Sequence, residues 1–258
     1  MYYQSADDMI RIHYNKKRGA AILHFILSFL LLALCFIQPV QAAPQIIVNI
    51  PEYRLSLIED GTVRKAYRIA VGTHDEQTPT GTYRIAAKEM FPTWFPGSKF
   101  EDKTPVAFGP ENPLGTRWLE FYPAYGIHGT NKGWDINYPV SGGCIRMDNQ
   151  DVEELYEHVE VSTSVTIRYE SMVLEERPDG LYLKVWPDIY RRQLNTAEHF
   201  ASLYAKYEQK YPQAQMPQFL RDGNQPETAM TLKIASSVAA AIQPAPALLP
   251  PKPEFSRR

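Results

Sequence analysis

The stretch Tyr125-Gly-Ile-His-Gly-Thr-Asn131, followed by Ser141-Gly-Gly-Cys-Ile-Arg-Met147, decides how this chain is interpreted. It brings a histidine and a cysteine into one glycine-rich region. The chain has two cysteines, and the other one, Cys35, lies in an apolar N-terminal segment that is typical of an export signal. Cys144 is then the single cysteine of the exported protein and has no partner for an internal disulfide. We therefore interpret Cys144 as a nucleophile and His128 as its base.

The chemistry of a thiol nucleophile explains the residues around it. A free thiol with a pKa of about 8.5 is mostly protonated at neutral pH, so it needs a base. The imidazole of His128 can take the thiol proton and return it to the leaving amine. Gly142 and Gly143 allow a sharp turn that points backbone N–H groups at a developing oxyanion. Arg146 has two possible roles: it fixes a substrate carboxylate, or it ties the loop down.

Short strands separated by turns are predicted from residue 45 to about residue 170, with one helix. Asp60-Gly61 predicts a hairpin turn. Asn149 is predicted to cap a helix whose apolar side chains recur with helical spacing from Val152 to Val159. The expected strands are residues 45–50, 53–58, 63–71, 82–86, 118–122, 126–128 and 165–169.

Residues 91–117 show no periodicity and are rich in proline, glycine and aromatic residues. A loop of this length inside a compact domain is usually functional. Trp94, flanked by Pro92 and Pro96, has two possible roles: it forms the wall of a cleft, or it is a surface staple of the core.

Composition divides the chain into four parts. Residues 1–42 carry a basic start and an apolar run, which predict a signal peptide or an uncleaved membrane anchor. The remainder is then exported, to the periplasm or the cell-wall space. Residues 45–170 form the domain with the His–Cys segment. Residues 171–212 are predicted to form a hairpin and helix extension, in which Asn195-Thr-Ala-Glu198 resembles a capping box. Residues 213–258 are predicted to be a low-complexity, proline-rich and disordered tail.

Charge and side-chain spacing exclude two classes of function. The chain has 27 Lys and Arg residues against 29 Asp and Glu residues, which gives a net charge of −2 and no support for a nucleic-acid-binding face. No set of His, Cys and Asp residues has metal-ligand spacing. We therefore expect no nucleic-acid partner, no metal and no cofactor.

Several blocks of the sequence, in order, resemble the L,D-transpeptidase (YkuD-type) catalytic domain, a family that cross-links peptidoglycan. The His–Cys segment carries most of this resemblance, and the separation of 16 residues (144 minus 128) also suits the family. The resemblance runs from about residue 45 to residue 170. The other matching blocks are Ile47-Val-Asn-Ile-Pro-Glu-Tyr-Arg-Leu55, Thr78-Pro-Thr-Gly81, Pro92-Thr-Trp94 and Asn112-Pro-Leu-Gly115.

The resemblance implies a mostly β fold, a β-sandwich with a helix after the cysteine loop, and acyl transfer on peptidoglycan stem peptides. Cys144 would attack the carbonyl of the third stem residue and expel D-Ala. The acyl group would pass to an amine of another stem or of an anchored wall protein. His128 carries over as the base, and Gly129 as the residue whose backbone orients the imidazole. Ser141, Gly143 and Cys144 match the loop that forms the oxyanion hole.

One position departs from the family pattern. Most relatives have a histidine directly after the serine, where this chain has Gly142. That departure leaves a catalytically weak wall-binding module as an alternative. Hydrolysis, as in an L,D-carboxypeptidase, is a second alternative, because water and an amine compete for the same acyl-enzyme. A papain-like hydrolase is discounted, because in those enzymes the cysteine precedes the histidine.

Overall fold

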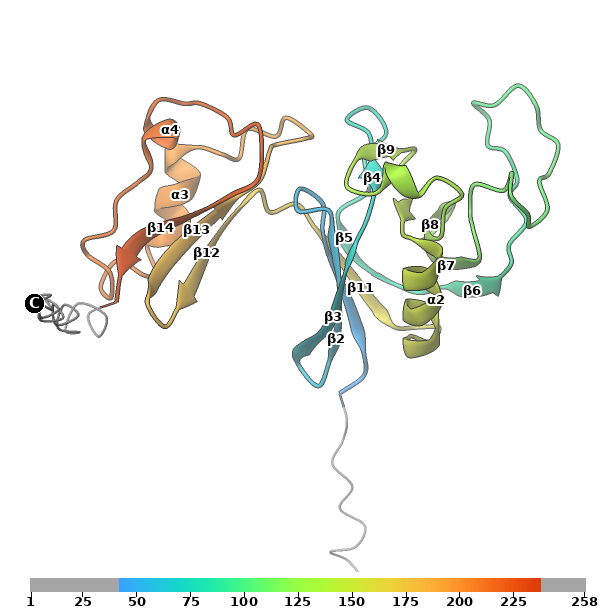
Figure 1. Ribbon diagram of the computed structural model, residues 1–258, viewed down its shortest axis with the longest axis horizontal. Helices are drawn as coiled ribbons and strands as arrows, with labels where there is room; N and C mark the ends of the chain where they lie inside the picture. Colours follow the sequence, from blue (N-terminus) through green and yellow to red (C-terminus); the bar gives the residue numbers. More distant parts are fainter. Residues whose placement is uncertain (1–41, 238–258) are drawn as a thin grey trace, which may run out of the picture. The chain divides into compact units, whose positions relative to one another are not determined.

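The computed structural model describes residues 42–237 (Figure 1). The segment predicted as a signal peptide or anchor, apart from Ala42, lies outside the described residues, as does the end of the predicted tail from residue 238. Within residues 42–237, no helix is long and apolar enough to cross a membrane.

The first sheet has five strands in the order β3-β2-β1-β11-β5. β1 and β11 run parallel, whereas the other neighbouring strands are antiparallel. Asp60 and Gly61 join β2 to β3 with φ values of 49° and 73°, which is the left-handed backbone of a tight hairpin turn and matches the prediction. The strand bounds are Gln45–Asn49 (β1), Arg54–Glu59 (β2), Thr62–Arg68 (β3), Gly81–Arg84 (β5) and Ser164–Arg168 (β11).

The second sheet has the order β10-β8-β7-β6, and a separate two-stranded sheet pairs β4 with β9. The helix α2, Asn149–His158, contacts β7 and β8 (Figure 1). The sequence did not predict β6, which follows β5 directly. The strand bounds are Val71–Gly72 (β4), Ala87–Met90 (β6), Arg117–Tyr122 (β7), Tyr125–His128 (β8), Pro139–Ser141 (β9) and Ile145–Arg146 (β10).

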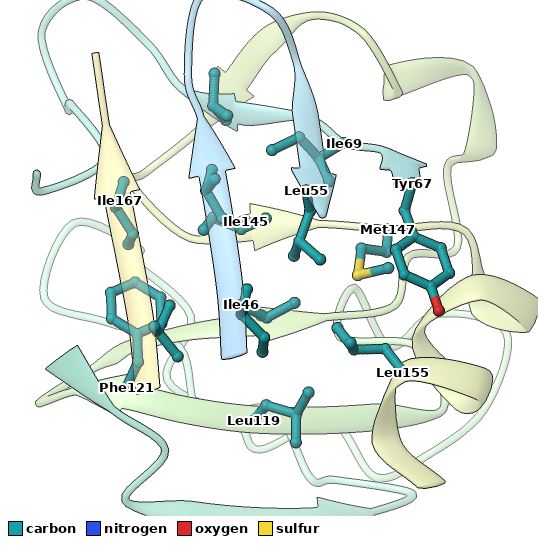
Figure 2. Packing of buried hydrophobic residues seen from close by; sticks show 14 of the residues in the cluster. Ile46, Leu55, Tyr67, Ile69, Leu119, Phe121, Ile145, Met147, Leu155 and Ile167 are labelled. Atoms are coloured by element: carbon teal, nitrogen blue, oxygen red, sulfur yellow. The ribbon is translucent and has the colours of Figure 1, made fainter. Parts of the chain in front are cut away.

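One apolar core joins the two large sheets and α2. Ile46 and Leu55 come from the first sheet, Leu119 and Ile145 from the second, and Leu155 from the helix, and all five side chains are completely buried (Figure 2). Burial of this kind is the main favourable term in folding. The core therefore fixes the strands that carry the His–Cys segment.

Tyr190 ties its own segment of the chain to this core. Its ring stacks on Tyr169 with centroids 5.1 Å apart. Its hydroxyl donates to the carbonyl oxygen of Gly72 at 3.0 Å and accepts from the backbone N–H of Thr78 at 3.1 Å. The turn that opens with Thr78 is thus held by a residue 112 positions later.

The C-terminal residues form a separate three-stranded sheet, β12-β13-β14, with its own core. Phe200 and Tyr211 are buried there. The cap of α3 lies one residue later than the capping box predicts, because the hydroxyl of Thr196 accepts from the backbone N–H of His199. The bounds are Met172–Arg177 (β12), Gly180–Val185 (β13), Ala197–Tyr204 (α3), Gln218–Arg221 (α4) and Met230–Ser236 (β14).

The tail predicted from residue 213 was wrong for its first part. Residues 213–237 contain α4 and the edge strand β14, which pairs with β13. Met230, Leu232 and Ile234 alternate with exposed polar residues and pack on the C-terminal core. An alternation this short is a weak strand signal beside the proline-rich sequence that follows it.

Candidate active site

The pairing of β8 with β10 brings the histidine and the cysteine together. These strands are parallel, with Ile145 opposite Ile127 and Arg146 opposite His128. Ile127 and Ile145 are completely buried in the core. Because side chains alternate across a strand, Cys144 and His128 lie on the other face, and both lie on the same one. The two residues thus share one face across neighbouring strands.

His128 is held as a buried, neutral imidazole. Only 3% of the residue is exposed, and Nδ1 donates to the carbonyl oxygen of Gly129 at 2.6 Å. Burial is the main cause that lowers the pKa of His128 from 6.5 to about 4; the charge of Arg146 acts in the same direction, and the carbonyl groups of Gly129 and Leu114 oppose both. With its proton on Nδ1, the ring leaves the lone pair of Nε2 free to accept a proton.

Cys144 is half-buried and has a protonated thiol. Burial raises the pKa of the thiol. The backbone N–H of Gly126 and the charges of Arg146 and Lys99 lower it, but by less than burial raises it. Sγ lies 3.8 Å from the carbonyl oxygen of Ala124, and within residues 42–237 no hydrogen bond joins Sγ to His128. Catalytic hydrogen bonds are often long before substrate binds. The resting pair is therefore a thiol and a neutral imidazole.

The loop before the cysteine is shaped by Ser141. Its Oγ donates to the carbonyl oxygen of Cys144 at 2.6 Å and accepts from the N–H of Gly143 at 3.1 Å. Gly143 has φ +106°, and a Cβ there would lie 2.4 Å from a ring carbon of Tyr125, so only glycine fits. The N–H of Gly143 is thus used within the loop, which differs from the oxyanion role expected of it. Among the described residues, the N–H of Cys144 has no acceptor and can serve an oxyanion.

Arg146 is committed to an ion pair. Its Nη1 lies 2.6 Å from Oδ2 of Asp135, and the two side chains are 20% and 15% exposed. Its backbone pairs with Ala70. This arrangement agrees with the second of the two roles predicted for Arg146, in which it ties the loop down.

A cavity of about 410 Å³ opens beside Cys144. Trp94 and Trp118 line it together with the cysteine, and the 91–117 loop also contributes Pro92, Thr93, Phe95 and Gly97. Trp94 is held by a two-way backbone pairing with Val106 and by edge-on packing against Phe100 at 4.9 Å. The structure thus places Trp94 in the wall of this cavity. Its remaining lining residues are Glu89, Leu114 and Ala124.

Asn112 is a positioning residue that the sequence analysis did not single out. It is completely buried, and its amide donates to the carbonyl oxygens of Pro92 and Val106 at 2.8 and 2.9 Å. Its Oδ1 accepts from the N–H of Leu114 at 2.8 Å. One side chain therefore closes the 91–117 loop on itself. The Asn112-Pro-Leu-Gly115 block marked this residue in the sequence, but it did not indicate which groups the Asn112 side chain would bond to.

Asn149 was predicted to cap the helix, and this was wrong. The N-cap position is Asp148, which makes no side-chain cap bond. Oδ1 of Asn149 instead accepts from the N–H of Thr116 at 3.2 Å, and its amide donates to the carbonyl oxygen of Thr130 at 3.0 Å. A Cβ on Gly129 would lie 2.1 Å from the same Oδ1. Asn149 therefore packs directly behind the residue that orients His128.

Among residues 42–237, no group of three His, Cys, Asp or Glu residues could hold a metal ion. The other histidines described lie elsewhere in the fold. His74 pairs with its neighbour Asp75 on the surface, and His158 lies 3.6 Å from Glu59.

Comparison with known proteins places this chain in a family. The L,D-transpeptidase catalytic domain (YkuD) matches residues 43–167. The putative L,D-transpeptidase YqjB of Bacillus subtilis is 35% identical over 145 residues, which cover 54% of this chain and 79% of that protein. The probable L,D-transpeptidase YbiS of Escherichia coli is 34% identical over 146 residues, 52% of this chain and 48% of that protein, so the chain spans about half of its length. The chain belongs to the L,D-transpeptidase family.

Among solved structures, an L,D-transpeptidase from Mycobacterium smegmatis is similar with a TM-score of 0.42 and 20% identity. The match covers 49% of this chain and 59% of that one.

Proposed function

We propose that this protein is an exported peptidoglycan L,D-transpeptidase that forms an acyl-enzyme on Cys144. The observation that carries the proposal is the β8–β10 register, which sets Cys144 and His128 on one face, with Cys144 lining the 410 Å³ cavity. A nucleophile with a neighbouring base and a free backbone donor is the arrangement that acyl transfer needs.

The reaction begins from a neutral pair. The carbonyl of the third stem residue lies at Sγ, and Nε2 of His128 takes the thiol proton as the S–C bond forms. A preformed thiolate–imidazolium pair is disfavoured, because burial raises the pKa of the thiol and lowers that of the imidazole. The N–H of Cys144 stabilises the oxyanion. When the intermediate collapses, His128 gives its proton to the amine of D-Ala, which leaves.

The acyl group then passes from Cys144 to an acceptor. The neutral imidazole takes a proton from the attacking amine and gives it to the departing Sγ as the S–C bond of the thioester breaks, which restores the thiol. The acceptor is an amine of a second stem peptide. An amine of a wall protein would react in the same way, and water would give an L,D-carboxypeptidase. The protein acts in the periplasm or the cell-wall space, where these peptides are found.

The test is incubation of the purified chain with disaccharide tetrapeptide and mass analysis of the products. Release of D-Ala with formation of a cross-linked dimer is expected from the wild type and not from Cys144→Ala. Release of D-Ala with only the shortened peptide would assign the hydrolytic activity instead. A folded wild-type chain that releases no D-Ala contradicts the proposal and favours a wall-binding module.

A further inference from the structure

An exposed ion pair lies over the cysteine loop. Nζ of Lys99 is 2.8 Å and 2.6 Å from the two carboxylate oxygens of Glu76. A Cβ added to Gly142 would lie 2.8 Å from the same Nζ. Lys99 comes from the 91–117 loop and Glu76 from the turn after β4. The ammonium group is thus held where a side chain at position 142 would begin.

Two cations act on the thiol of Cys144, and they differ in how firmly each is held by its carboxylate partner. Both Arg146 and Lys99 lower its pKa. Arg146 is locked to Asp135, whose side chain is only 15% exposed. The side chains of Lys99 and Glu76 are 52% and 46% exposed, and an ion pair in that setting contributes little to stability. Lys99 is therefore the cation that can exchange its carboxylate for one on a ligand.

We propose that Lys99 recognises a carboxylate of the donor peptide, and that Glu76 holds the ammonium group in place until the donor binds. This rests on the proposed function. The donor ends in D-Ala, whose free carboxylate lies one residue beyond the carbonyl that Sγ attacks. An ammonium group over residue 142 lies within reach of that carboxylate. A lysine is a flexible point charge, which suits a carboxylate that departs with the leaving group.

Gly142 completes this arrangement. A side chain at position 142 would displace Nζ of Lys99, so glycine is the residue that leaves room for the ammonium group. The histidine that the family resemblance leads one to expect there is absent, and the cation comes from the 91–117 loop instead. Recognition of the donor is thereby coupled to the position of that loop.

The experiment measures donor affinity by calorimetry in the full chain carrying Cys144→Ala, so that nothing is turned over. Three donors are compared: the tetrapeptide, its C-terminal carboxamide, and a tetrapeptide amidated on the diamino acid. The tetrapeptide should bind about tenfold more tightly than the carboxamide, as a charge-assisted hydrogen bond provides. Lys99→Gln should remove this preference, and Lys99→Arg should keep most of it. If only amidation of the diamino acid weakens binding, Lys99 recognises that carboxylate instead, and the C-terminal assignment is overturned.

Two further variants separate recognition from loop support. Lys103→Gln is the matched control, because Nζ of Lys103 contacts the carbonyl oxygens of Gly97, Ser98 and Phe100 within the same loop. It should leave the preference for the carboxylate intact. Glu76→Gln removes the competing carboxylate and should strengthen tetrapeptide binding, opposite in sign to Lys99→Gln. If Glu76→Gln and Lys99→Gln weaken binding equally with all donors, the ion pair is only a loop clamp and the proposal is wrong. Failure of the proposed function would appear separately, as absence of D-Ala release by the wild type.

Discussion

The indole of Trp118 lies nearly parallel to the imidazole of His128, with ring centroids 5.7 Å apart and 26° between the planes. The two residues are opposite each other on the antiparallel strands β7 and β8. The indole covers one face of the imidazole and also lines the cavity beside Cys144. It therefore helps to keep water from the ring, which is the condition that lowers the pKa of His128 to about 4.

The first prediction concerns the acid limb of the activity profile. Only neutral His128 can accept the thiol proton, so kcat/KM should persist to about pH 5 and fall as the pH drops through about 4. Trp118→Ala lets water solvate the charged imidazolium. The midpoint of the acid limb should therefore move to higher pH, toward the ordinary histidine pKa of 6.5. Profiles of D-Ala release against pH, from neutral pH to below the pKa of about 4, measure both effects. Identical acid limbs in the wild type and in Trp118→Ala would show that the indole does not set the pKa of His128.

The same pKa predicts how stability depends on pH. The folded state binds the proton less readily than the unfolded state, so stability is highest above the unfolded pKa of 6.5 and declines as the pH falls toward 4. The decline from this residue should be about 2 kcal/mol between pH 7 and pH 4.5. Denaturant unfolding of the wild type and of His128→Asn at both pH values separates the decline in stability due to His128 from the decline due to titrating carboxylates. An equal decline in both proteins would contradict a depressed pKa.

Local signals in the sequence predicted the elements whose partners are neighbours in the chain. Asp60-Gly61 occupies a hairpin turn, as predicted, since the conformation of a tight turn depends on the few residues within it. The roles proposed for His128 and Cys144 could also be predicted from the sequence, because a base and a nucleophile are recognised by residue type. The apolar alternation in Met230–Ser236 was present too, but a short edge strand gives a weak signal.

Contacts between distant segments could not be predicted in this way. The side chain of Asn149 bonds to Thr116, 33 residues away, and to Thr130, 19 residues away. The side chain of Asn149 can either cap the helix or make these distant contacts, and in the structure it makes the distant contacts. The pairing of Lys99 with Glu76 spans 23 residues, and nothing in either segment signals the other. Tertiary packing, rather than propensity, decided both positions.

The third prediction tests the position of Asn149. Asn149→Ala leaves the N–H of Thr116 and the buried carbonyl of Thr130 without their partner, which should cost about 2 kcal/mol of unfolding free energy. It should also lower kcat, because Gly129 loses the group packed against it. Asp148→Ala is the matched control: it changes the N-cap position, which makes no side-chain cap bond, and should have a small effect. If Asp148→Ala destabilises the protein more than Asn149→Ala, the helix cap is the important role after all.

The fourth prediction concerns Trp94. Trp94→Ala removes an aromatic surface from the cavity wall and should raise KM about tenfold, in line with the loss of one aromatic contact. The melting temperature should fall only slightly, because the core of the domain is unchanged. Phe108→Ala is the matched control on the same loop, where Phe108 packs on Phe91 at 4.6 Å and does not line the cavity. A large loss of stability with unchanged kinetics in the folded fraction would make Trp94 a staple of the loop.

The last prediction is that a carbapenem acylates Cys144. A strained lactam carbonyl is an acyl donor, and the thiol, the imidazole of His128 and the free N–H of Cys144 together provide what opening the ring requires. The leaving nitrogen stays tethered to the acyl group after the ring opens, so nothing departs to admit an acceptor, and the thioester should persist. Intact-mass spectrometry should show one added drug mass per chain, and peptide mapping should place it on the peptide that contains Cys144.

The adduct should disappear in Cys144→Ala and form more slowly in His128→Ala, with partial recovery at alkaline pH as the thiol ionises unaided. Because burial raises the pKa of this thiol, that recovery should begin at a higher pH than for a free cysteine. A folded wild-type chain that remains unmodified after prolonged incubation would show that the cysteine loop, with Gly142 in place of a histidine, does not activate its thiol.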